Sequence, residues 1–168
     1  FIDYANENGL AGDLTLELEI ADDQYSPDLT PGAVTTLIDS GVHIFSGIIG
    51  SPNNLAVRDT LNDNCIPQLL SLTGAPDWGE VADYPWTTGG LIPYPVESRA
   101  YATKMAADHP DGATVGLFYV NNEFGQVYAE AFTELTDEFG LEIVAEETIE
   151  ATDSNPPTAQ ITSIASEQ

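Results

Sequence analysis

The chain has 168 residues, of which 42% are hydrophobic, enough for one medium domain or two partial ones. Its charge is extreme, because three Lys and Arg residues stand against 28 Asp and Glu residues, a formal net charge of -25. Such a surface repels phosphate backbones and anionic lipids, which excludes a nucleic-acid-binding or membrane-surface role. Salt would screen the self-repulsion, so we interpret the acidity as adaptation to salt or to an extracytoplasmic setting.

The pattern predicts alternating strands and helices in the first half of the chain. The strands expected here, in chain order, cover residues 14–20, 42–49, 66–72 and 84–90. The helices expected between them cover residues 2–8, 30–40 and 51–62. Thr30 and Ser51 are each followed by proline, so we expect both to be helix N-caps. Asp22 and Asp23, after the first strand, indicate a solvated turn.

Turn formers and aromatic residues crowd residues 89–95, where we place the crossing between two domains, 1–90 and 91–168. Beyond it, the helices predicted cover residues 96–108, 123–139 and 158–166, and the strands cover 114–120 and 141–147. The run 114–120 is continuously apolar, so we expect that strand to be buried on both faces. Alternation of this kind predicts an α/β fold with parallel sheets and right-handed crossovers.

Three strand-to-helix junctions end in small or polar residues: residues 50–53, 72–75 and 121–125. Ordinary loops also need glycines and caps, so each junction alone is equally typical of a loop without function. Ligands of open α/β sheets bind beyond the carboxyl ends of the strands, where the junctions would meet. Because a helix N-terminus offers free N–H groups and a positive dipole end, we expect Ser51 to help hold a small carboxylate.

Signals for other chemistry are weak or absent in the sequence. There is no glycine fingerprint or phosphate loop, so we expect no enzyme activity and no cofactor. His43 and His109 lack partners at metal-ligand spacing, and we expect no metal site. Cys65 is the only cysteine, which rules out an internal disulfide, and we expect it to pack beside Ile66. The aromatic residues near the crossing are either hinge packing or an aromatic wall of a cleft: Trp78, Tyr84, Trp86 and Tyr94.

The order and spacing of several short segments resemble the periplasmic or extracellular solute-binding proteins of ABC importers, in the branched-chain amino-acid (leucine/isoleucine/valine-binding) family. The matching segments are residues 1–9, 19–23, 50–57, 66–69, 73–75, 84–89 and 122–125. The resemblance implies two Rossmann-like lobes with parallel sheets, the periplasmic binding protein type 1 fold, which close on a small solute. Here that fold is incomplete.

The resemblance also implies which residues meet the ligand. The loop matching Ser51 supplies a hydroxyl and N–H donors to a carboxylate, and the loop matching Leu72, Thr73 and Gly74 supplies backbone groups. An aromatic residue at the position of Phe124 packs over the ligand from the second lobe. Asn122, from the same junction, completes the candidate ligand-binding set.

Two positions depart from the pattern of amino-acid binders. Phe124 lacks a hydroxyl, and Gly74 stands where a hydroxyl residue is common. An amino acid, an aliphatic or aromatic acid and an amide therefore all stay open as ligands.

The resemblance covers about half of a family member. The first strand, expected before Phe1, and the rest of the second lobe lie outside these residues, including the acidic residue that usually holds a ligand ammonium. We therefore expect a missing segment or a second chain to complete the fold. No signal peptide is visible, and Phe1 is not a natural start, so an upstream segment is expected.

The function predicted is an extracytoplasmic solute-binding protein, periplasmic or extracellular and either lipid-anchored or secreted. It would capture a small carboxylated ligand for an ABC permease and bind no nucleic acid. The alternative within the same fold is the ligand-sensing domain of a membrane receptor or regulator. A flavodoxin-like or nucleotide-binding enzyme is disfavoured by the missing phosphate loop.

Overall fold

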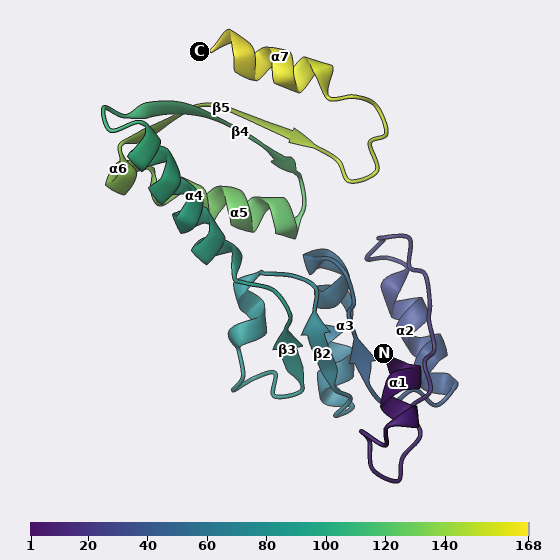
Figure 1. Cartoon of the computed structure of the whole chain (residues 1–168). Coiled ribbons are helices and arrows are strands. Elements are labelled where there is room, and N and C mark those ends of the chain that lie inside the picture. Colours follow the sequence, from purple (N-terminus) through teal and green to yellow (C-terminus); the bar gives the residue numbers. More distant parts are fainter. Residues whose placement is uncertain (168) are drawn as a thin grey trace.

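Five strands form two separate parallel sheets in the computed structural model, which describes residues 1–167. The first sheet has the order β1-β2-β3, and the second pairs β4 with β5 (Figure 1). The bounds are Phe45–Ser46 for β1, Gln68–Ser71 for β2, Thr87–Gly89 for β3, Ala113–Val120 for β4 and Leu141–Ile149 for β5. Every pairing is parallel, so the predicted α/β class is confirmed.

Helices flank both sheets. In the first half these are α1 (Ile2–Glu7), α2 (Thr30–Asp39) and α3 (Ser51–Asp63), with a 3₁₀ turn over Pro76–Gly79. In the second half they are α4 (Tyr94–Asp108), α5 (Glu123–Thr133), α6 (Thr136–Phe139) and α7 (Thr158–Ser166). The second sheet lies between α7 on one face and α5 with α6 on the other (Figure 1).

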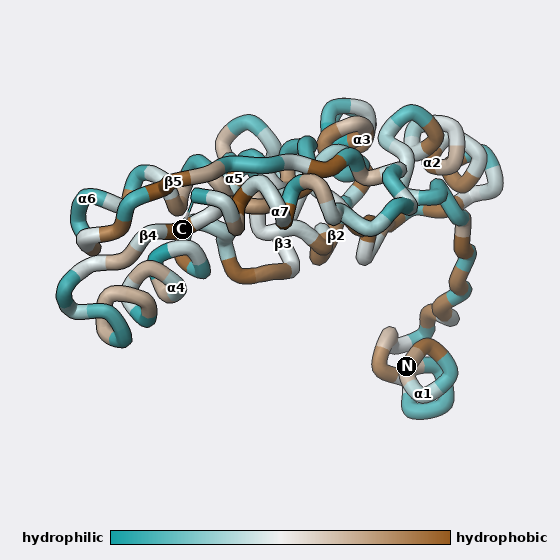
Figure 2. Tube along the Cα trace, turned by 90° about the horizontal axis from the view of Figure 1, so that it is seen from above, coloured by the Kyte–Doolittle hydropathy of each residue, from teal (hydrophilic) through white to brown (hydrophobic). Residues whose placement is uncertain are grey.

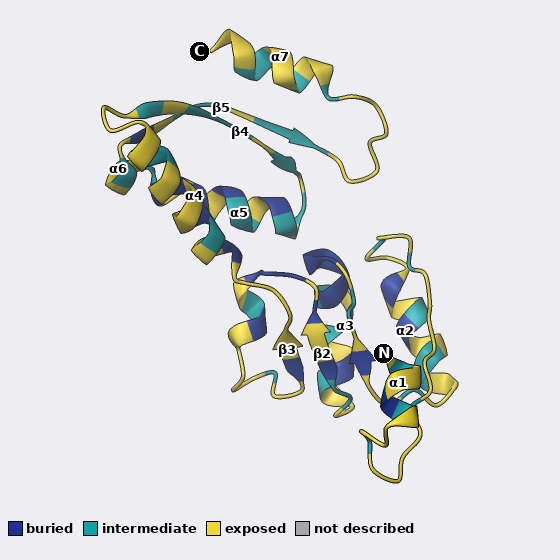
Figure 3. Cartoon of the chain, viewed as in Figure 1, coloured by how far each residue is buried: buried dark blue, intermediate teal, exposed yellow. Residues whose placement is uncertain are grey.

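Each half has its own apolar core, and a third cluster joins them. Val34, Phe45, Val57 and Leu61 form the core of the first half, and Ala102, Phe132, Leu135 and Leu141 form that of the second. The third cluster holds Ala75, Trp78 and Tyr94, with Leu55, Phe124, Val127 and Tyr128 packed against it. Buried residues are concentrated in α3 and around the end of β2 (Figure 3). The cluster at the crossing therefore positions the second half against the strand ends of the first.

The strand predicted over residues 14–20 is not formed. The segment is extended and links α1 to the rest of the molecule, with alternating hydropathy along its trace (Figure 2). No described strand lies beside it to complete its hydrogen bonds. The Asn6 side chain satisfies the backbone groups of one residue in this segment. Its Nδ2 donates to the Leu16 oxygen and its Oδ1 accepts from the Leu16 nitrogen, both at 2.8 Å.

Both predicted N-caps are wrong by one residue. Gly50, with a φ of 96°, is the cap of α3, and Ser51 is the first helical residue. Leu29 precedes α2 in the same way, so Thr30 lies inside that helix. In both cases the hydroxyl is used for a tertiary hydrogen bond instead of a cap.

Three further expectations are corrected. Strand β4 is half-buried, since β5 is its only described neighbour in the sheet. The helix expected up to Gly140 is divided into α5 and α6. Cys65 is exposed, in a left-handed conformation just after α3, and does not pack in the interior.

Candidate ligand-binding site

Two hydroxyl groups meet where the first two strands end. Ser51 opens α3 and Thr73 follows β2, and their Oγ and Oγ1 atoms lie 2.7 Å apart. Both residues are 0% exposed, and the Thr73 oxygen also accepts from the Ala75 nitrogen at 3.1 Å. The strands β1 and β2 are parallel neighbours, so their carboxyl ends bring the two loops together as the sequence suggested.

Leu72 lies in this region, but its backbone is already paired. Its nitrogen donates to the Ile48 oxygen at 2.9 Å, and its oxygen accepts from the Gly50 nitrogen at 3.2 Å. These bonds extend the β1–β2 pairing up to Gly50, the N-cap of α3. A ligand contact through the Leu72 N–H would have to replace a bond of the sheet.

Gly74 is covered directly by the crossing between the halves. Its oxygen accepts from the Tyr94 nitrogen at 2.6 Å. A Cβ at this position would lie 2.3 Å from the Ile92 oxygen and 2.6 Å from the Tyr94 ring. The ring of Tyr94 thus occupies the space that a serine or threonine side chain would need, which explains the glycine physically.

Asn122 and Phe124 come from the N-terminus of α5 in the second half. The Asn122 Oδ1 accepts from the Phe124 and Gly125 nitrogens at 3.1 and 3.2 Å, so Asn122 is the N-cap. The Phe124 ring meets the Tyr94 ring edge-on, with centroids 5.3 Å apart. Leu55, one turn along α3 from Ser51, belongs to the same cluster. The predicted residues of both halves therefore gather around one junction.

Asp23 is a residue whose structural role the sequence analysis missed. Its carboxylate accepts from the Thr30 hydroxyl at 2.7 Å, the Asn53 Nδ2 at 2.8 Å and the Tyr25 nitrogen at 3.0 Å. Burial raises the pKa of Asp23, but these hydrogen bonds outweigh it and hold the pKa below its ordinary value. The bond to Tyr25 two residues on is a local turn preference of Asp that sequence can suggest, whereas the partner Asn53 is distant in the chain.

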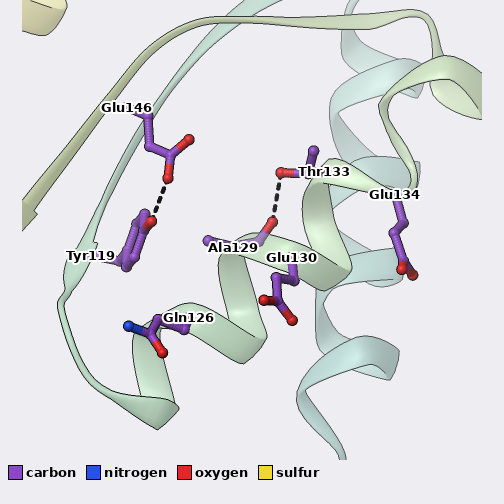
Figure 4. Close-up of a pocket in the computed structure, with 7 residues that line it drawn as sticks. All are labelled: Tyr119, Gln126, Ala129, Glu130, Thr133, Glu134 and Glu146. Atoms are coloured by element: carbon purple, nitrogen blue, oxygen red, sulfur yellow. Dashed lines mark hydrogen bonds between the residues drawn. The ribbon is translucent and has the colours of Figure 1, made fainter.

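A hollow of about 380 Å³ lies apart from this junction, between α5 and the second sheet (Figure 4). The Tyr119 hydroxyl there donates to Glu146, which raises the pKa of Tyr119. Glu130 and Glu134 also line it.

Among the described residues, no group of three His, Cys, Asp or Glu side chains is arranged to hold a metal ion. None of the described helices is long and apolar enough to cross a membrane.

The sequence matches the model of one protein family, described as periplasmic binding protein, over residues 1–168. The chain belongs to the periplasmic binding protein family. This confirms the resemblance stated from the sequence, and the family is one of binding proteins. No curated protein sequence matches the chain significantly.

Solved structures share the fold of this periplasmic binding protein at low identity. A branched-chain amino acid ABC transporter protein from Thermus thermophilus with bound valine is 18% identical, with a TM-score of 0.81 and 98% of this chain covered. An ABC transporter solute-binding protein from R. palustris in complex with benzoate is 19% identical, with a TM-score of 0.80 and 98% covered. The alignments span 42% and 47% of those two chains, so this chain corresponds to less than half of their length.

Proposed function

We propose that these residues are part of an extracytoplasmic solute-binding protein that captures a small carboxylated ligand for an ABC permease. Residues 1–90 and 91–168 would belong to its two lobes, and the protein would be periplasmic or extracellular, lipid-anchored or secreted. The observation that carries the proposal is the Ser51–Thr73 hydroxyl pair at the N-terminus of α3, with Asn122 and Phe124 brought up from the other half.

A local site for an anion is needed because the protein as a whole repels anions. With a net charge of -25, long-range attraction of a carboxylate is absent. Hydroxyl donors and the positive end of a helix act over a few ångströms and favour negative charge there. Ser51 stands at that helix end, and this supports its assignment to the ligand carboxylate.

The residues around the pair favour a ligand with an apolar body. Tyr94 and Phe124 present aromatic rings, and Gly74 offers no side-chain hydroxyl. We therefore propose an amino acid or an organic or aromatic acid, held mainly by its carboxylate. Ser51 and Thr73 are fully buried, so we propose that the halves separate before a ligand reaches them. Closure around the ligand would then exclude water and strengthen each polar contact.

We also propose that the first sheet receives one more extended segment, from outside residues 1–168. A hollow of about 870 Å³ runs between residues 15–23 and 40–49, two stretches without strand partners on the sides that face it. Leu18, Ile20 and Ile44 are exposed beside it. An apolar strand there would pair both edges. Slow amide exchange at Leu18 and Ile44 in the full-length protein would support this, and exchange at the rate of an unpaired segment would contradict it.

The test of the ligand site is Ser51→Ala, with Ser154→Ala, an exposed serine outside the junction, as the matched control. Sodium benzoate and L-valine are the probes, titrated calorimetrically into the full-length protein. Loss of a hydrogen bond to a charged group weakens binding by about 1.5–3 kcal/mol, or roughly tenfold to a hundredfold. If a probe binds the wild type and Ser51→Ala equally well, Ser51 is not part of the site. If neither probe binds the wild type, the assignment to small carboxylates loses its support.

A further inference from the structure

One cation of the chain is enclosed where the loop after β2 lies along α3. Arg58 is the only Lys or Arg among residues 1–90, and its side chain is 11% exposed. Its Nη1 donates to the Asp77 oxygen at 3.1 Å and to the Glu80 carboxylate at 3.0 Å. A guanidinium that is withdrawn from water bonds more strongly than one in a surface ion pair, which contributes little. Arg58 therefore joins α3 firmly to the residues that follow β2.

Two aromatic rings from the same loop lie against this guanidinium. Its carbon is 3.6 Å from the centroid of the Tyr84 ring and 5.6 Å from that of the Trp78 ring, so both are within range of a cation–π interaction. The Tyr84 hydroxyl also donates to Asp59, the next residue of α3, at 2.8 Å. Trp78 is buried and belongs, with Ala75 and Tyr94, to the cluster that joins the halves. Both rings therefore help to hold the loop on α3.

The loop is consequently joined to α3 at two points. At the first, the hydroxyl of Ser51, which begins α3, meets the hydroxyl of Thr73. At the second, the Arg58 guanidinium meets the Asp77 oxygen. Only residues 74–76 separate Thr73 from Asp77, and so short a stretch of chain has little reach. The position of Asp77 therefore restricts where the Thr73 hydroxyl can lie.

A ligand carboxylate that accepts from both hydroxyls removes the first of these connections. Each hydroxyl has one proton to donate, and the bond between Ser51 and Thr73 uses one of the two protons. When both protons go to the carboxylate, that bond is lost and the connection at Arg58 remains. We propose that Arg58 is a positioning residue that keeps the Thr73 hydroxyl beside Ser51 while both bind the ligand. This role rests on the function proposed above, whereas the connection through Arg58 does not.

The first experiment follows the Thr73 hydroxyl without any ligand. The Ala75 nitrogen donates to the Thr73 Oγ1 at 3.1 Å, so hydrogen exchange at Ala75, measured by NMR in the full-length protein, reports whether that oxygen stays in place. Arg58→Met keeps the length of the side chain and removes the guanidinium, and exchange at Ala75 should become roughly tenfold faster. Exchange in β4 should be unchanged, because the effect is local, whereas a general loss of stability would increase both rates.

Two matched variants separate the guanidinium from its charge. Arg58→Lys keeps the charge but has no planar group to stack on an aromatic ring, so it should restore part of the protection at Ala75. Arg99, on α4, also bonds a carboxylate, Glu138 at 2.8 Å, and lies over the Phe139 ring. Arg99→Met should therefore leave exchange at Ala75 unchanged. Equal exchange at Ala75 in Arg58→Met and the wild type, or an equal increase at Ala75 and in β4, would overturn the proposal.

The second experiment measures binding of sodium benzoate and L-valine to the full-length protein by calorimetry. Loss of one hydrogen bond to a charged ligand should raise the Kd about tenfold in Arg58→Met, less in Arg58→Lys and not at all in Arg99→Met. An unchanged Kd in Arg58→Met, for a probe whose binding is weakened by Ser51→Ala, would also overturn the proposal. If neither probe binds, or Ser51→Ala has no effect, the proposed function fails and with it the role of Arg58 toward a ligand. Faster exchange at Ala75 in Arg58→Met would then still show that Arg58 holds the loop on α3.

Discussion

Replacement of Gly74 by serine tests how the crossing is packed. The new Cβ would lie 2.3 Å from the Ile92 oxygen and 2.6 Å from the Tyr94 ring, so the backbone of the crossing would have to move. Overpacking of this kind costs about 1–3 kcal/mol. The 2.6 Å bond from the Tyr94 nitrogen to the Gly74 oxygen would also be weakened, at a cost of about 1 kcal/mol. We therefore expect Gly74→Ser to lower the free energy of unfolding by about 2–4 kcal/mol.

Thermal unfolding followed by circular dichroism is a sufficient assay. For a chain of this size each kcal/mol shifts the melting temperature by about 2–4 °C, so a fall of about 5–15 °C is expected. Gly79→Ser is the control, because a Cβ at Gly79 meets nothing within 4 Å and its φ is not left-handed. If Gly74→Ser, Gly79→Ser and the wild type all have the same melting temperature, the inference that Tyr94 fills the side-chain space of residue 74 is refuted.

Three further predictions concern charge and capping. Because the folded-state pKa of Asp23 lies below its ordinary value of 3.8, the unfolded chain binds the proton first as the pH falls. The stability that Asp23 contributes is therefore present above about pH 4 and lost below it, and Asp23→Asn should show a flatter acid-unfolding curve than the wild type. Equal curves would contradict the network with Thr30 and Asn53. Sodium chloride should raise the melting temperature, since it screens the repulsion within a net charge of -25, and a melting temperature independent of salt would contradict this. Asn122→Ala should lower the free energy of unfolding, measured with a chemical denaturant, by about 1 kcal/mol, because α5 loses its cap. Asn155→Ala, at an exposed position, is the control and should leave it unchanged. Equal effects of the two substitutions would contradict the capping role of Asn122.

Most elements could be predicted from local sequence because they depend on short-range periodicity and turn chemistry. Helix α7 begins and ends where its pattern predicts, and β2 and β5 lie within a few residues of expectation. Boundaries were less predictable where a hydroxyl has two possible uses. Ser51 could have capped α3, but Thr73, in the next strand's loop, takes its hydrogen bond.

Within the candidate site, the sequence indicated the loops and missed the contacts that join them. The glycines and polar residues after β1, β2 and β4 marked the three junctions. Nothing local showed that Tyr94 covers Gly74 or that Tyr25 lies on Gly50, since each pair is separated by about 20 residues or more. Asp22 and Asp23 share one local pattern, yet Asp23 alone anchors the turn to α3.

By itself, the sequence determined the α/β class, the family, the absence of an internal disulfide and the positions of the strand-to-helix junctions, because composition, periodicity and motif spacing are properties of the chain. Only the tertiary structure decided that residues 14–20 do not form a strand, that Ser51 and Thr73 share one buried hydrogen bond, and that the Tyr25 ring lies on Gly50. The physical reason is that these outcomes depend on which distant backbone or side chain lies opposite each group.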